Sequence, residues 1–153
     1  MNMFNAQLTV ELPTLGPASL SDSYLNSANS LFVGAEELSK GTSEMAIACS
    51  FLCAQVVECT LKSYVSHVGV TEKDLKNNLL RHNLILLWGM AADKGLPINN
   101  EPPEWCNILS NTHDSPYVLR YQKGTMLIQT PDLILMIAEI KDLLLTIKAA
   151  IES

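Results

Sequence analysis

The segment 43–68 constrains the fold more than any other feature of the chain. It carries apolar or small side chains nearly all the way round a helix, and Gly69 follows it as a stop signal. A helix that is apolar on most sides must be surrounded by other elements. We therefore predict that residues 43–68 form a central helix covered by further helices.

A first covering helix is predicted just before the central one. Apolar residues recur at steps of three and four from Tyr24 to Leu38. Ser21 or Ser23 can cap its N-terminus, and Gly41 can end it.

Three further helical segments follow the central helix. Residues 71–95 are predicted to be helical in one or two pieces, and Pro102 and Pro103 begin a short helix over about 102–111. The last helix has Thr130 as its expected cap and Pro131 at its first position. Its apolar seam consists of Leu133, Ile137, Ile140, Leu144, Ile147 and Ile151. Glu139 and other charged residues inside this helix would be costly in lipid, so no membrane span is expected.

These segments predict an all-α protein. With 153 residues the chain is the size of one ordinary domain. Short connections between the helices favour an antiparallel up-and-down helical bundle of four to five helices over residues 21–153. Residues 1–20 contain prolines and a glycine that interrupt regular structure, so we expect an extended N-terminal arm there.

Charge and cysteine content narrow the classes of function. A net charge of −6 and the absence of a basic run argue against a broad nucleic-acid surface, which leaves RNA or nucleotide recognition to a few cations in one cleft. The four cysteines lack zinc-site spacing and are expected to be free thiols, mostly buried. The start of the chain has no signal-peptide pattern, so we expect a cytoplasmic protein. No metal site is expected from three separated histidines, and nothing indicates a cofactor.

An ion pair is expected within the central helix. Glu58 and Lys62 are four residues apart, and their neighbours one turn away are apolar. A carboxylate that borders a core requires a partner. We predict that Glu58 is mostly buried and bonded to Lys62, Arg120 or a backbone donor. The pair either balances a solvated strip or lines a cleft between helices.

The order of three short motifs resembles the HEPN superfamily of small α-helical bundles. They are "VVECTLKSYV" at the end of the central helix, "RHNLILLW" followed by "AADKG", and "YVLRYQ" before the last helix. The resemblance covers about residues 21–150. It implies one of two behaviours: a metal-independent RNase that uses an Arg followed after four to six residues by a His, or a binding module, including partners of small nucleotidyltransferases.

The Arg-to-His spacing that the resemblance implies for a nuclease is absent. The pair that comes nearest to this spacing is Lys76 with His82. Lysine, however, lacks the planar guanidinium group with which arginine holds a phosphate through two hydrogen bonds. If there is nuclease chemistry, we expect it at His82 with Lys76 or Arg120. His82 can equally be a hydrogen-bonded residue of the bundle, and His113 is expected in a loop.

Other residues can bind a ligand near this region. Arg81 and Asn83 flank His82, and the resemblance places Arg120 and Tyr121 in its late Arg-Tyr motif. An arginine beside an aromatic ring can hold a phosphate and stack a base. The alternative is that Arg120 ties an irregular loop to the central helix.

Three hypotheses follow. The leading one is a HEPN-like binding or regulatory module without catalysis, which recognises RNA or a nucleotide or partners a nucleotidyltransferase. The second is a HEPN endoribonuclease of a toxin-antitoxin or antiviral defence system. The third is a structural subunit that binds another protein. Surplus apolar residues on the last helix, such as Leu135, Met136, Leu143 and Leu145, predict a two-fold homodimer.

Overall fold

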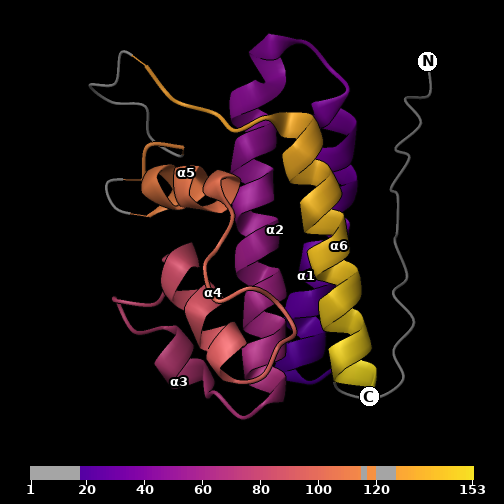
Figure 1. Ribbon diagram of the computed structural model, residues 1–153, viewed down its shortest axis with the longest axis vertical. Coiled ribbons are helices and arrows are strands. Elements are labelled where there is room, and N and C mark those ends of the chain that lie inside the picture. The colour runs from indigo at the N-terminus through magenta and orange to yellow at the C-terminus, as the bar shows by residue number, and fades with distance from the viewer. Residues whose placement is uncertain (1–17, 115–116, 120–126) are drawn as a thin grey trace, which may run out of the picture.

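The protein is an all-α helical bundle, described by a computed structural model for residues 18–114, 117–119 and 127–153. Six α-helices and one 3-10 turn follow one another in these residues, without strands (Figure 1). The predicted all-α bundle is confirmed. The predicted N-terminal arm lies largely outside the described residues, and Leu20 already belongs to the first helix.

Three long helices form the body of the bundle: α1 (Leu20–Ser39), α2 (Ala46–His67) and α6 (Leu133–Glu152). The connection between α1 and α2 is short and contains the 3-10 turn η1 (Ser43–Met45), so the two helices form an antiparallel hairpin. Helix α6 lies alongside both (Figure 1).

Three shorter helices follow α2 in the chain: α3 (Glu72–Leu75), α4 (Leu84–Asp93) and α5 (Glu104–His113). Helices α4 and α5 cover the remaining side of α2, and α3 lies below α4 in Figure 1. The segment predicted to be helical over 71–95 is thus two helices, with an irregular connection at 76–83. Helices α4 and α5 pack on α2 and on each other. This places the α3–α4 connection and the end of α5 near the same stretch of α2.

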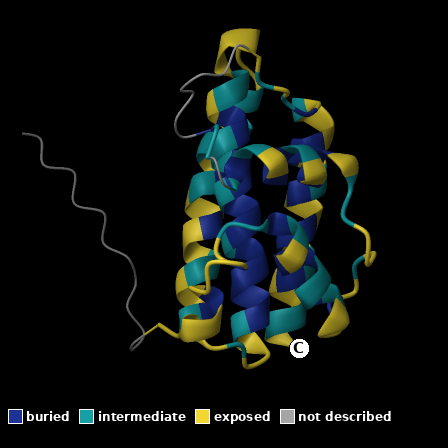
Figure 2. Ribbon diagram, turned by 90° about the vertical axis from the view of Figure 1, so that its left-hand side faces the viewer, coloured by how far each residue is buried: buried dark blue, intermediate teal, exposed yellow. Residues whose placement is uncertain are grey.

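Helix α2 is central, as predicted. It packs against α1, α4, α5 and α6, and its buried residues run along most of its length (Figure 2). By length and composition alone, Ser43–His67 could cross a membrane, and half of its most apolar window is buried inside the protein. The core helix of a packed bundle has the same properties, so this is only weak support for a span.

The seam of α6 faces the bundle. Ile137, Ile140, Leu144 and Ile147 are buried, and the two end residues of the seam pack against the core. Of the surplus apolar residues on this helix, Met136 and Leu143 are also buried. Contrary to the sequence-based expectation, these two side chains are therefore not available to a dimer interface. Leu135 and Leu145 remain exposed, together with Ile134.

Two predicted helix caps were wrong. Ser19, rather than Ser21 or Ser23, caps α1, and a reciprocal capping box with Asp22 is present. Asp132, rather than Thr130, caps α6 by accepting from the backbone N–H of Leu135. A capping side chain must lie just outside the helical backbone, and serine or aspartate neighbours in the sequence compete for that position.

Candidate functional site

The ion pair expected from the sequence is present and buried. Lys62 Nζ donates to Glu58 Oε1 at 2.6 Å, and the two side chains are only 7% and 8% exposed. Lys62 Nζ also donates to the backbone carbonyl of Arg81 at 2.9 Å and lies 5.9 Å from the centre of the Tyr24 ring. The prediction that Glu58 is buried and bonded to Lys62 is confirmed. The pair lies under other elements, not on a solvated strip.

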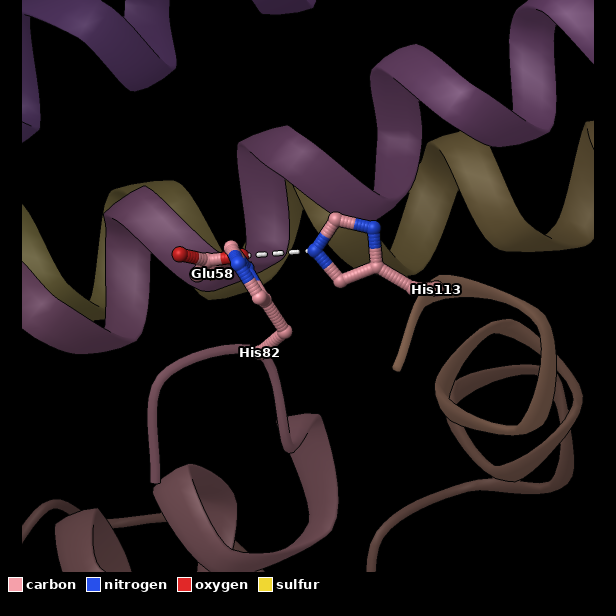
Figure 3. A group of neighbouring side chains, drawn as sticks. All are labelled: Glu58, His82 and His113. Carbon is pink, nitrogen blue, oxygen red and sulfur yellow. Dashed lines mark hydrogen bonds and ion pairs between the residues drawn. The ribbon is translucent and has the colours of Figure 1, made fainter. Parts of the chain in front are cut away.

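Two histidines complete the cluster around Glu58. His82 comes from the α3–α4 connection, with Nδ1 3.0 Å from Glu58 Oε2, and His113 ends α5, with Nε2 2.6 Å from the same oxygen. Figure 3 shows the three side chains converging from these separate elements. The two imidazole rings meet edge to face with centroids 5.5 Å apart. We call Glu58, Lys62, His82 and His113 the Glu58 cluster.

The hydrogen bonds assign the proton positions on the imidazoles. An ionised carboxylate only accepts hydrogen bonds, so His82 donates through Nδ1 and His113 through Nε2. The hydrogen bond to Glu58 leaves Nδ1 as the second ring nitrogen of His113. His113 is fully buried, and this Nδ1 has no hydrogen-bond partner among the residues that the structure describes.

The cluster keeps Glu58 ionised. Burial raises the pKa of a carboxyl group, but the hydrogen bond from His113, the charge and hydrogen bond of Lys62 and the hydrogen bond from His82 outweigh it. The pKa of Glu58 is held at about 2, below its usual 4.5. Within the cluster, the Glu58 carboxylate and the Lys62 ammonium balance each other's charge.

The same residues have the ligand atoms of a metal site. The oxygen and nitrogen atoms offered by Glu58, His82 and His113 lie within 4.8 Å of one another. A divalent ion would, however, share the carboxylate with the Lys62 ammonium and leave an excess of positive charge in a buried place. It would also require a proton on His113 Nδ1, for which the described residues supply no acceptor. The chemistry of the cluster therefore opposes metal binding.

The other predicted site residues have different positions. Asn83 is the N-cap of α4, where its side chain accepts from the N–H of Leu86 at 3.0 Å. The Arg81 side chain is exposed, and only its backbone carbonyl joins the cluster. Lys76 caps the C-terminus of α3 and pairs with Glu72 at 2.7 Å on the surface. Arg120 and Tyr121 lie outside the described residues.

His113 is the member that sequence reasoning missed. It was expected in a loop, but it is the last residue of α5 and is fully buried. A signal was present: Trp105, Leu109 and His113 follow at steps of four, so His113 extends the buried stripe of a short helix. Its neighbours Asn111 and Asp114 are polar and conceal that stripe.

Comparisons with protein-family models, with curated proteins and with solved structures found no match.

Proposed function

We propose that this chain is a HEPN-like binding or regulatory module without catalysis. The observation that supports it is the saturation of Glu58: one buried carboxylate accepts from Lys62, His82 and His113. These bonds tie the α3–α4 connection and the end of α5 to the central helix. Glu58, Lys62 and His82, which lie in motifs of the family resemblance, thus serve to hold the bundle together.

The positions of the candidate nuclease residues support the absence of catalysis. His82 uses Nδ1 to bond Glu58, and the Lys76 ammonium is engaged with Glu72 on the surface. A metal-independent RNase needs a cation to hold the phosphate beside a histidine that transfers a proton. The Lys62 ammonium, which shares Glu58 with His82, is already bound to this carboxylate and to the backbone carbonyl of Arg81.

The proposed partners are a second copy of this chain and a nucleotidyltransferase, with RNA or a nucleotide as further ligands. The net charge of −6 favours the protein partners. Leu79 and Leu86 are exposed on and beside α4, and Leu86 borders a groove of about 580 Å³. An exposed apolar surface of this kind suits a two-fold homodimer. The α3–α4 connection, with His82, would then lie near the dimer axis.

One observation favours the nuclease as a second candidate. A carboxylate that holds one nitrogen of an imidazole fixes the orientation of the ring and leaves the other nitrogen for chemistry. Glu58 and His82 have this arrangement, and the His82 side chain is 12% exposed. With His82 as the base, a dimer could bring a phosphate-binding cation from its second copy.

Two measurements test the proposal. Purified protein is incubated with single-stranded RNA in the presence of a chelator, and its mass is measured by light scattering at micromolar concentration. We expect intact RNA and a dimer mass. His67→Ala changes an exposed histidine and is the control. Cleavage of RNA that is lost in His82→Ala and kept in His67→Ala would contradict the binding module and support the nuclease. A monomer mass would contradict the proposed homodimer.

A further inference from the structure

A second polar region of the protein is a pocket of about 450 Å³ that the Glu58 cluster does not share. It is lined by Trp88 on α4, Glu101 and neighbouring residues of the α4–α5 connection, Trp105 on α5, and Glu139 and Asp142 on α6. Its volume lies in the range of small-molecule sites in proteins. We call it the tryptophan pocket.

Two indole rings form one wall of the pocket. Trp88 and Trp105 are 6% and 4% exposed, and their rings meet edge to face with centroids 6.2 Å apart. Both indole N–H groups are already used: Trp88 donates to the backbone carbonyl of Asn99 at 2.8 Å, and Trp105 donates to the Glu139 carboxylate. The indoles therefore offer a ligand a small exposed area of ring and no free N–H donor.

The charge of the pocket has one sign. Glu139 and Asp142 lie one turn apart on α6, and Glu101 lies on the α4–α5 connection. Among the residues that the structure describes, no Lys, Arg or His lines the pocket. None of these three carboxylates has an ion pair within the described part of the chain. A ligand that neutralises them must be a cation.

The spacing of the carboxylates distinguishes between kinds of cation. Within the residues that the structure describes, ligand atoms close enough to share a metal ion occur at Glu58, His82 and His113, and not in the tryptophan pocket. A larger cation can reach separated carboxylates and at the same time contact the exposed part of an indole, since aromatic rings attract ammonium and guanidinium groups.

We propose that the tryptophan pocket binds a small organic cation of the alkyl-ammonium or guanidinium class. The carboxylates of Glu101, Glu139 and Asp142 neutralise its charge, and the indoles of Trp88 and Trp105 contact its carbon chain or its planar group. This site goes beyond the proposed binding module and does not depend on the HEPN resemblance. The cation comes either from a free amine or from an arginine side chain of a peptide.

Tryptophan fluorescence reports on this pocket alone, because the chain has two tryptophans and both line it. The full chain is titrated with agmatine, which carries a guanidinium and an ammonium group, and with a neutral alkylurea of similar length. We expect a saturable change in emission for agmatine with a Kd below about 1 mM, and none for the alkylurea. A capped pentapeptide with a single arginine is the second probe.

Charge-removing variants locate the binding. The double variant Glu101→Gln with Asp142→Asn leaves Glu139 and its bond to Trp105 in place, and it should raise the Kd for agmatine about tenfold. The matched control, Glu44→Gln with Glu152→Gln, removes two exposed carboxylates outside the pocket and should leave the Kd unchanged.

The outcomes separate cleanly. Binding of agmatine alone identifies a free amine, and equal binding of the peptide identifies an arginine side chain. No saturable change with either cationic probe, or an equal weakening in both double variants, would overturn the proposal. The nuclease and mass measurements above do not bear on it, so the two proposals can fail separately.

Discussion

The Glu58 cluster and the tryptophan pocket place carboxylates in opposite situations. Glu58 is buried and accepts hydrogen bonds from three side chains, one of them a cation. Glu101 and Asp142 are exposed, and the described part of the chain places no cation in the lining of their pocket. A buried charge that is fully paired stabilises the arrangement of the elements around it. Like charges around an open pocket instead attract a ligand of the opposite charge. The first region is suited to holding structure and the second to binding.

The largest effect should come from Glu58→Gln. The change leaves the Lys62 ammonium buried without a counter-ion, which typically costs about 3–5 kcal/mol of stability. Urea unfolding followed by circular dichroism measures this loss. The matched control is Glu72→Gln, which breaks the ion pair to Lys76 with the same four-residue spacing but with side chains 54% and 67% exposed. A similar loss of stability in both variants would contradict the structural role of the Glu58 cluster.

The next largest effect is a dependence of stability on pH. The pKa of Glu58 in the folded protein is about 2, below the usual 4.5, so ionised Glu58 contributes its full stabilisation above about pH 4.5. This contribution, on the order of 3 kcal/mol, should be lost as the pH falls from about 4.5 towards 2. The free energy of unfolding is measured across this window for wild type and Glu58→Gln. Parallel curves for the two proteins would show that Glu58 is not the group responsible.

The two histidines of the cluster should differ in their contribution. His113 is fully buried, so His113→Ala removes a hydrogen bond and leaves a cavity, whereas the His82 side chain is 12% exposed and its site can admit water. We expect His113→Ala to lose about 2 kcal/mol more stability than His82→Ala. Denaturation midpoints of the two variants decide the order. A larger loss for His82→Ala would mean that the α3–α4 connection, and not α5, depends most on Glu58.

The smallest effect should have the opposite sign. Asp142→Asn removes a charge that lies one turn from Glu139 on α6, and like charges at this spacing destabilise a helix. We therefore expect a gain on the order of a few tenths of a kcal/mol. The same urea experiment, with replicate midpoints and Glu44→Gln as the control, measures it. A clear loss of stability would show that Asp142 has a favourable partner and that the pocket is not an unpaired acidic site.

Much of the fold was predictable because it follows from local patterns. The all-round apolar character of 43–68 identified the central helix, and the step pattern of the last helix identified the face that packs into the bundle. Leu80, Leu84, Leu87 and Ala91 likewise recur at steps of four and three, a pattern that indicates an inward face, and all four residues are buried. Helix ends were less predictable, since Ser19 and Asp132 compete with nearby residues that cap helices equally well.

The sequence by itself determined the all-α bundle, the central place of α2, and the ion pair of Glu58 with Lys62, because each depends on residues close together along the chain. Only the tertiary structure decided that His82 and His113 bond the same carboxylate oxygen, 24 and 55 residues away from Glu58. It also decided that Trp88, Trp105 and the carboxylates of α6 share one pocket. These contacts depend on how α4, α5 and the connections between them pack on α2 and α6. The spacing of residues along one helix does not determine how separate helices pack together.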